Sequence, residues 1–303
     1  MTDRRSLLEA IPAPHPDIAP LPAAAICEPG VRMLRGVPFA RVEGSRPLEL
    51  DLWLPGRTGA GTVPVPLVLF VHGGAWRAGR RDDMGLQTRD WSPGPFARIA
   101  AAGIAVACAD YRLSGEARFP APLEDLRAAL SWLTLRSAEL GLDTGRTVVW
   151  GDSAGGHLAS LLALTHTAPA PVGAVVWYGL SDLTAPRGHY DPQSASTPEA
   201  MLLGGPPAMA GERARAASPL SLAHEGAPPF LLIHGEEDTM VPCSHSQDLA
   251  TRLRETGAPV ELRTVPGADH CWYGLPSARV EEIFDHSLRF AKLATASGPS
   301  RDS

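Results

Sequence analysis

This chain has little of what marks nucleic-acid-binding or membrane-spanning proteins. Of its 27 basic residues only Lys292 is a lysine, and the arginines are interspersed with acidic residues. Because the formal net charge is −6 and no Lys/Arg cluster occurs, we expect no binding to nucleic acid or to an anionic membrane surface. No run approaches the roughly 20 apolar residues of a membrane span, so none is expected.

Cysteine is also scarce, and its spacing follows no metal or redox pattern. This usage predicts free thiols in a reducing compartment, and therefore a cytoplasmic location. We find no metal-ligand spacing elsewhere, so neither a metal ion nor an organic cofactor is expected. The chain has four cysteines: Cys27, Cys108, Cys243 and Cys271.

The N-terminal 45 residues are rich in proline and weakly patterned. Prolines recur from position 12 to position 22, which prevents the helical core of an export signal. We therefore expect an extended arm over 1–45, followed by one folded domain over 46–295 and a flexible tail over 296–303.

Strand-like and helix-like segments alternate after this arm. Residues 48–54 alternate apolar and polar side chains, which predicts a half-buried antiparallel strand. Residues 67–71 are continuously apolar, which is typical of a strand covered on both faces. The alternation predicts an α/β fold with a mostly parallel central sheet and helices on both faces. Further strands are predicted at 103–109, 147–150, 172–178, 230–233 and 260–265, and helices at 120–133, 157–164, 244–256 and 278–294.

Residues 181–226 interrupt the alternation. This segment is rich in Pro, Gly, Ala and Ser and contains a short apolar run at 201–203. A stretch of this length without strands indicates a cap inserted over a site. A disordered excursion is the alternative.

The most informative motif is Gly151-Asp152-Ser153-Ala154-Gly155. It follows a β-branched apolar run and precedes a helical pattern, which is the context of a nucleophile elbow. A side chain at either glycine would collide with a turn tight enough to lift Ser153 clear of the sheet. The following helix directs its free N–H groups toward developing negative charge. Ser153 is therefore the candidate nucleophile.

A serine hydroxyl needs a base to take its proton, and the base needs a carboxylate to hold its tautomer. In hydrolases with this elbow, the acid and then the histidine follow the serine along the chain. Asp238 and His270 each follow a predicted strand, in loops where a parallel sheet places functional groups. They are the candidate acid and base. Glu236 and Glu237, earlier in the same turn, are alternatives for the acid.

Three nearby polar residues are expected to be structural. Asp152 is placed to brace the elbow rather than to act as a base. His157 lies within the helix that follows the elbow. His234, at the end of a predicted strand, is expected to make local hydrogen bonds.

A tetrahedral intermediate also requires hydrogen-bond donors for its oxyanion. The His-Gly-Gly-Ala-Trp stretch at 72–76 follows a predicted strand, and glycine lets the backbone approach a substrate closely. We expect the N–H groups of Gly73, Gly74 and Ala154 to form an oxyanion hole. The contribution of Ala75 stays open, because a third glycine is usual at its position.

Aromatic residues adjoin the predicted catalytic loops. They are candidates for the lining of an apolar acyl pocket, and burial in the core is the alternative. The small residues of the cap favour short or medium acyl chains. The residues are Trp76, Trp272 and Tyr273.

Together these motifs resemble those of α/β-hydrolases in the esterase/lipase group with a His-Gly-Gly oxyanion stretch, the hormone-sensitive-lipase-like and acetyl- and feruloyl-esterase-like branch. The resemblance covers roughly residues 45–295. It implies a carboxylesterase-type serine hydrolase that forms an acyl-enzyme, with Ser153 as nucleophile, Asp238 as acid and His270 as base. The stretches that carry it, besides those above, are 110–113, 120–125, 234–238 and 267–270.

Other functions stay open at this point. The same triad could cleave an amide, as in an arylformamidase or an aminopeptidase-like enzyme, although the propeller domain of related peptidases is missing. The chain could also be a non-catalytic binding protein with a hydrolase fold, but such proteins typically lose a triad member. The expected partner is a small-molecule ester, and we expect a monomer or a homodimer.

Overall fold

The computed structural model describes most of the chain. The beginning of the predicted arm, residues 1–13, and nearly all of the predicted tail, residues 297–303, lie outside the described residues. The described residues are 14–56, 59, 61–166, 168–187 and 191–296.

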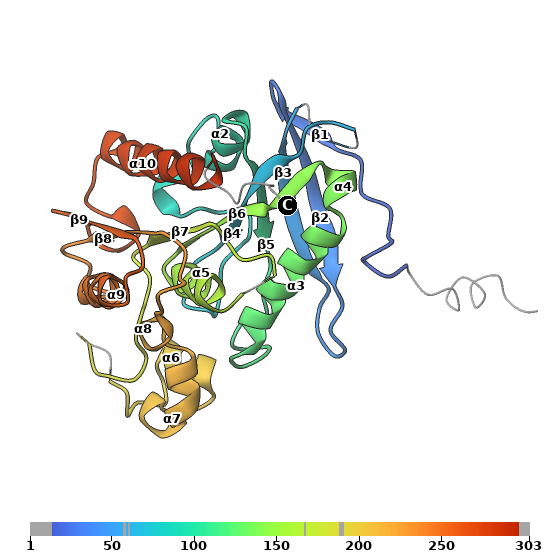
Figure 1. Ribbon diagram of the computed structural model, residues 1–303. Helices are drawn as coiled ribbons and strands as arrows, with labels where there is room; N and C mark the ends of the chain where they lie inside the picture. Colours follow the sequence, from blue (N-terminus) through green and yellow to red (C-terminus); the bar gives the residue numbers. More distant parts are fainter. Residues whose placement is uncertain (1–13, 57–58, 60, 167, 188–190, 297–303) are drawn as a thin grey trace, which may run out of the picture.

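The centre of the fold is a nine-stranded sheet in the order β1-β2-β3-β5-β4-β6-β7-β8-β9 (Figure 1). The first three strands pair antiparallel at one edge, and β3 is also antiparallel to β5. Every further pair is parallel, so the predicted mostly parallel sheet is confirmed. The strands are β1 (Ala25–Glu28), β2 (Val31–Ala40), β3 (Leu48–Pro55), β4 (Val65–Val71), β5 (Ala105–Ala109), β6 (Leu142–Asp152), β7 (Gly173–Trp177), β8 (Phe230–Gly235) and β9 (Val260–Val265).

Strands β1 and β2 lie within the predicted arm, and this part of the prediction is wrong. Met33 of β2 pairs with Trp53 of β3, so the segment is an integral edge of the sheet. The register of β2 on β3 shifts between Leu34 and Val37 and again between Pro38 and Ala40. These irregularities break the two-residue period by which a strand is detected in a sequence.

Strand β3 is more deeply buried than its alternating sequence predicts. Its polar residue Asp51 is only 3% exposed, although it occupies a position expected to face solvent. The Asp51 carboxylate accepts a hydrogen bond of 2.8 Å from the N–H of Gly36 and forms an ion pair with Arg81. These partners replace water, so the polar side chain tolerates burial.

Helices cover both faces of the sheet, as predicted. α2 (Pro95–Ala101) and α10 (Ser277–Ala296) pack on one face, at the top of Figure 1, and α3 (Ala121–Leu135), α5 (Ala154–Thr165) and α9 (Ser244–Glu255) pack on the other. Two buried apolar clusters result, one on each face. Short elements complete the domain: α4 (Ser137–Leu140) and the 3-10 helices η1 (Leu86–Thr88) and η2 (His270–Trp272).

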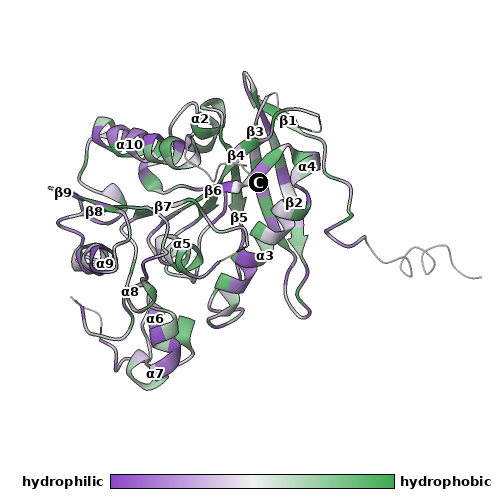
Figure 2. Cartoon of the chain, in the orientation of Figure 1, coloured by the Kyte–Doolittle hydropathy of each residue, from purple (hydrophilic) through white to green (hydrophobic). Residues whose placement is uncertain are grey.

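The strands supply alternate side chains to these two clusters. In β4, Leu67, Leu69 and Val71 face the α3–α5 side, whereas Val68 and Phe70 face the α2–α10 side. Figure 2 shows the hydrophobic colouring concentrated on these central strands. A strand buried on both faces has no polar face, which explains its continuous apolar sequence.

The predicted insertion lies between β7 and β8 and is helical. It contains α6 (Pro198–Leu203), α7 (Pro207–Ala216) and α8 (Pro219–Leu222). Figure 1 shows α6 and α7 set apart from the sheet, below α5 and α9 in that view. We call residues 181–226 the cap segment from here on.

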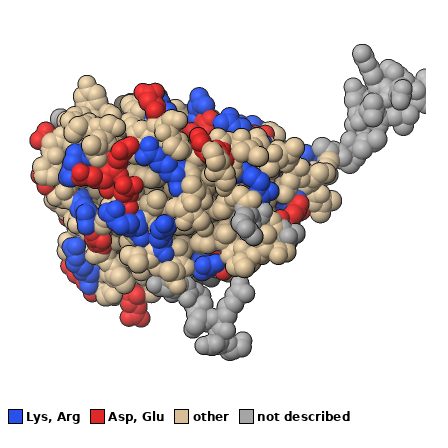
Figure 3. Space-filling model, turned by 90° about the horizontal axis from the view of Figure 1, so that it is seen from above, with Lys and Arg blue, Asp and Glu red and all other residues tan. Residues whose placement is uncertain are grey.

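The surface carries charge of both signs. Figure 3 shows acidic and basic side chains intermingled on the face seen from above. Within the described ranges, no helix combines the length and the apolar character that crossing a membrane requires.

Candidate active site

Ser153 lies at the junction of β6 and α5, where the strand–turn–helix pattern predicts it. Its φ of 52° and ψ of −123° form a conformation that side-chain-bearing residues rarely adopt. A Cβ atom on Gly151 would lie 2.3 Å from the carbonyl oxygen of Gly155, and one on Gly155 would lie 2.1 Å from that of Val71. The turn therefore closes only with glycine at both positions.

The structure brings Ser153, His270 and Asp238 together. His270 Nε2 lies 3.0 Å from Ser153 Oγ, and His270 Nδ1 lies 2.7 Å from Asp238 Oδ2. A carboxylate can only accept, so Nδ1 carries the proton and Nε2 is left to accept from the serine hydroxyl. The three side chains form a continuous hydrogen-bonded chain, although Ser153 and His270 lie 117 positions apart in the sequence.

Asp238 is surrounded by hydrogen-bond donors. Its Oδ1 accepts from the N–H groups of Met240, at 3.0 Å, and Val241, at 2.7 Å. His234 Nε2 lies 3.4 Å from its Oδ2, which also faces His270. Burial alone raises the pKa of this carboxyl, but the hydrogen bonds from both histidines and from Val241 outweigh it and hold the pKa well below its ordinary value. The carboxylate is ionised across the neutral range.

The alternative acids do not reach His270. Glu236 and Glu237 are exposed, and the carboxylate of Glu236 accepts a hydrogen bond of 2.6 Å from Thr264. The neighbouring Asp269 instead ties the two loops together, because its Oδ1 accepts from the N–H of Thr239 at 2.8 Å and from that of His270 at 2.7 Å.

Asp152, on the other side of Ser153, has different surroundings. It is buried, and its Oδ1 accepts a hydrogen bond of 2.9 Å from the N–H of Gly73. A Cβ atom on Gly73 would lie 2.5 Å from Asp152 Oδ2, so this contact requires glycine. Burial raises the pKa of Asp152 to about 7, and the Gly73 hydrogen bond only partly opposes this.

The predicted oxyanion hole needs one correction. The N–H of Gly73 is already bonded to Asp152 and is not available to a substrate. Among the described residues, no partner is found for the N–H groups of Gly74, Ala75 and Ala154. We therefore replace Gly73 by Ala75 in the candidate donor set. The Gly73–Asp152 bond joins positions 79 apart, so no local pattern reveals it.

The loop of residues 72–76, which we call the oxyanion loop, has a strained backbone. Ala75 and Trp76 have φ values of 54° and 56°, in the left-handed region that side chains disfavour. Tyr111 Oη donates to the carbonyl of His72 at 3.0 Å, and the N–H of Ser114 donates to the carbonyl of Trp76 at 2.7 Å. The surroundings thus fix the loop at both ends.

The aromatic residues proposed for a pocket divide into two groups. Trp76 and Trp272 are each 1% exposed, so burial in the core is the better description of both. Tyr273 is 69% exposed. A residue without a sequence signal, Tyr178, packs edge-on against both Trp272 and His270, with ring centroids 4.7 and 4.8 Å apart.

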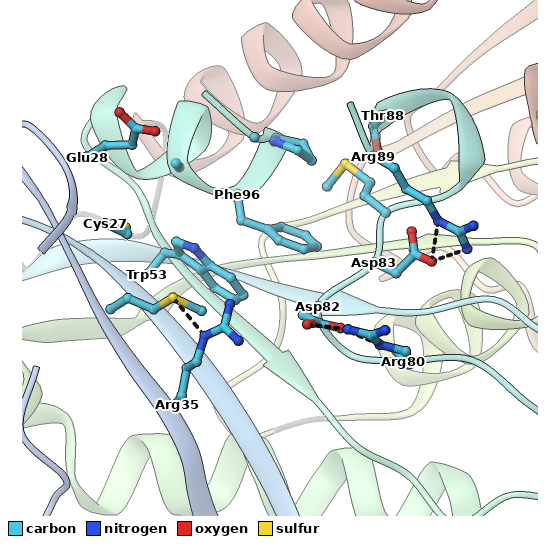
Figure 4. A pocket seen from close by; sticks show the side chains of 15 residues that line it. Cys27, Glu28, Arg35, Trp53, Arg80, Asp82, Asp83, Thr88, Arg89 and Phe96 are labelled. Atoms are coloured by element: carbon cyan, nitrogen blue, oxygen red, sulfur yellow. Dashed lines mark hydrogen bonds and ion pairs between the residues drawn. The ribbon is translucent and has the colours of Figure 1, made fainter. Parts of the chain in front are cut away.

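A cavity of about 530 Å³ is separate from this constellation (Figure 4). Its wall includes the rings of Trp53 and Phe96, whose centroids are 4.7 Å apart. Two ion pairs lie in its wall, one between Arg80 and Asp82 at 2.9 Å and one between Arg89 and Asp83. None of the triad residues lines this cavity.

The described residues hold no cluster of three or more His, Cys, Asp and Glu side chains able to bind a metal ion.

The chain is similar in sequence to known proteins. The family model described as BD-FAE matches residues 50–253. Esterase LipC of Mycobacterium tuberculosis (strain ATCC 25618 / H37Rv) is 32% identical over 252 residues, which is 78% of this chain and 60% of LipC. The probable carboxylic ester hydrolase LipM of the same strain is 30% identical over 250 residues, 78% of this chain and 56% of LipM. The chain thus spans 60% or less of the length of these relatives.

Solved structures show the same fold. A truncated form of a carbohydrate esterase from gut microbiota superposes with a TM-score of 0.74 at 22% identity, over 92% of this chain and 100% of that one. The propionate-bound esterase Est2 of Thermogutta terrifontis gives a TM-score of 0.70 at 22% identity, over 91% of this chain and 97% of that one. The fold is that of the α/β-hydrolases.

Proposed function

This chain belongs to the BD-FAE family, and we propose that it is a carboxylesterase, a serine hydrolase that cleaves carboxylic esters through an acyl-enzyme. One observation carries the proposal: Ser153 Oγ, both nitrogens of His270 and the Asp238 carboxylate form one hydrogen-bonded chain beside unoccupied backbone donors. The relatives named as esterases support the choice of an ester over an amide.

In the acylation step, Ser153 Oγ attacks the ester carbonyl while His270 Nε2 accepts the hydroxyl proton. The imidazolium that forms donates from Nδ1 to Asp238, whose ionised carboxylate stabilises the new positive charge. His270 then transfers the proton to the alcohol oxygen as the carbon–oxygen bond breaks. The products of this step are the free alcohol and an acyl ester on Ser153.

The tetrahedral intermediate places its oxyanion against the N–H groups of Gly74, Ala75 and Ala154. The N–H of Ala154 opens helix α5, so the partial positive charge of the helix N-terminus adds to its effect. In deacylation, His270 takes a proton from water, the resulting hydroxide attacks the acyl carbonyl, and the acid is released as the proton returns to Ser153.

We also propose that the ester substrates carry acyl chains of short to medium length. The small side chains of the cap segment support a modest cavity. The similarly folded Est2 of Thermogutta terrifontis has been solved with propionate and with butyrate bound.

We also propose a cytoplasmic monomer or homodimer. All four cysteines are free thiols in the described residues, which supports a reducing compartment. Size-exclusion chromatography with light scattering would distinguish the two assembly states.

Replacing Ser153 by alanine tests the proposal directly. The nucleophile is lost while the fold keeps its turn, so we expect hydrolysis of p-nitrophenyl acetate to fall by roughly 10⁴-fold or more. Wild-type protein should react with a fluorophosphonate probe and Ser153→Ala should not. An alanine variant that stays active, or a wild type that ignores the probe, would show that the nucleophile lies elsewhere.

Competing substrates decide between the ester and the amide hypotheses. We expect p-nitrophenyl acetate and butyrate to be turned over faster than N-formylkynurenine and an aminoacyl anilide. Preference for either amide would replace the carboxylesterase proposal by an arylformamidase or an aminopeptidase, with the same triad.

A further inference from the structure

His157 uses both nitrogens of a fully buried imidazole ring. The indole N–H of Trp76 donates to His157 Nδ1 at 3.2 Å, and His157 Nε2 lies 2.6 Å from the carbonyl oxygen of Ala217. The Trp76 and His157 rings are also in edge-to-face contact, with centroids 5.0 Å apart. The His157 side chain has no accessible surface.

The chemistry of the two partners fixes the protonation state of the ring. An indole N–H can only donate and a carbonyl oxygen can only accept, so Nδ1 of His157 is bare and Nε2 carries the proton. A second proton would direct an Nδ1–H group at the N–H of Trp76. Burial lowers the pKa of His157 to about 4, which agrees with a neutral ring at neutral pH.

The three residues belong to three different parts of the site. His157 lies one turn along α5 from the nucleophile Ser153. Trp76 directly follows Ala75 and ends the strained oxyanion loop. Ala217 connects α7 to α8 in the cap segment. One imidazole ring therefore touches the helix of the nucleophile, the loop of the oxyanion donors and the cap.

The strain in the oxyanion loop gives these contacts a consequence. Left-handed φ values at Ala75 and Trp76 persist only when the surroundings hold them. The Trp76 side chain is the anchor of this backbone, since it is buried and its only polar atom is bonded to His157. If the indole ring shifts, the peptide N–H of Ala75 shifts with it.

We propose that His157 is a positioning residue: its Nδ1 fixes the oxyanion loop through Trp76, and its Nε2 seats the cap segment through Ala217. The proposal rests on the proposed esterase function for its kinetic consequence. It predicts that the two halves of the ring have separable effects, one on the chemical step and one on the cap.

Two amide substitutions separate these halves. The side-chain amide of His157→Asn ends near the position of Nδ1, so it can still accept from Trp76 but cannot reach Ala217. The longer side chain of His157→Gln can reach Ala217 but leaves the Trp76 N–H without its acceptor. Either amide group can present an oxygen or an N–H as its partner requires.

We expect His157→Gln to lower kcat by about 10- to 100-fold, with a smaller change in KM, because displaced oxyanion donors act on the transition state. The fall in kcat for His157→Asn should be about ten times smaller than that for His157→Gln. His157→Asn should instead raise KM, because the cap segment loses its hydrogen bond at Ala217. Trp76→Phe should reproduce the kcat loss of His157→Gln, and the double variant should be no slower than either single one.

Trp132→Phe is the matched control. Trp132 is also buried, at 3% exposed, and its indole N–H donates to the carbonyl of Pro16 at 3.0 Å, away from the catalytic loops. Loss of this hydrogen bond in Trp132→Phe should lower the melting temperature as Trp76→Phe does, but kcat should stay unchanged.

Limited proteolysis gives a readout that does not depend on esterase activity. His157→Asn should accelerate cleavage within the cap segment, and His157→Gln should not. If the two variants lose the same melting temperature, keep similar kcat values and are cleaved alike, His157 is an ordinary core residue and the proposal is overturned. Failure of the esterase proposal itself would appear instead in the wild type, as preference for an amide substrate or as no reaction with the fluorophosphonate probe.

Discussion

Two buried carboxylates flank the Ser153–His270 pair, and their surroundings are opposite. Asp238, on the loop after β8, accepts two backbone hydrogen bonds and faces two imidazole rings, and its pKa is depressed. Asp152, on the elbow itself, accepts one described hydrogen bond, from Gly73, and its pKa is raised to about 7. Burial is common to both side chains, so it does not decide their charge.

The number of donors around each buried carboxyl therefore decides its role in this site. Each donor that points at Asp238 favours the ionised form, which a protonated His270 needs as its partner. With a single donor, Asp152 gains little from ionisation and acts mainly as an acceptor that fixes Gly73. Environments that push two carboxyl pKa values apart assign them different tasks.

Removal of the negative charge at Asp238 should reduce activity most. Asp238→Asn should lower kcat by roughly 10⁴-fold, because an amide can stabilise neither the Nδ1–H tautomer nor the imidazolium of His270. Steady-state hydrolysis of p-nitrophenyl acetate measures it. Glu237→Gln, in the same turn but exposed, is the control and should remain fully active. If Glu237→Gln lowered kcat as much as Asp238→Asn does, the assignment of Asp238 as the acid would be wrong.

A smaller effect is expected at Asp152, and it should depend on shape rather than on charge. Asp152→Ala removes the acceptor of the Gly73 N–H, so the oxyanion loop shifts and kcat should fall by about 10- to 100-fold. Asp152→Asn keeps an oxygen at that position and should recover most of the activity. Equal losses in the alanine and asparagine variants would mean that the negative charge itself matters.

The change with the least bearing on the reaction itself is in how stability depends on pH. Because the folded pKa of Asp152 lies above the unfolded value, the folded protein keeps a proton that the unfolded chain releases between about pH 4 and pH 7. The contribution of Asp152 to the free energy of unfolding therefore falls as pH rises through this window, by on the order of 4 kcal/mol at most. Asp152→Asn should gain stability relative to wild type toward pH 7.

Melting temperatures of the two proteins, measured from pH 4 to pH 8, test this expectation. Asp238 gives the opposite sign, because its depressed pKa contributes stability above the unfolded value that is lost as pH falls. Asp238→Asn should therefore cost most stability at neutral pH, and this cost should begin to shrink only as pH falls below about 4. Parallel curves for wild type and Asp152→Asn would contradict the raised pKa.

The features of this protein that can be predicted from its sequence are those encoded by residues close together in the chain. Central parallel strands such as β4 and β7 contain continuous apolar runs, and the elbow is a contiguous motif whose glycines have a steric cause, so both are predictable. The acid and base loops follow from strand order. Strands β1 and β2 were missed because bulges interrupt their period.

The site features that escaped prediction are contacts between distant positions. The bond from Gly73 to Asp152 and the one from Trp76 to His157 span 79 and 81 residues. No periodicity encodes them, and a histidine inside an apolar helix is typical of a satisfied core residue. Tyr178 escaped for the same reason, since an aromatic residue at a strand end resembles ordinary packing.

The position of the cap segment has a consequence for how the chain can diversify. It leaves β7 and returns into β8, and these strands are direct neighbours, with Trp177 paired to Ile233. Its two ends are thus attached to adjacent points of a rigid frame, while Ser153 and His270 belong to other connections. Insertions and deletions between these strands can therefore change the cap segment while the strand frame that carries Ser153 and His270 stays intact.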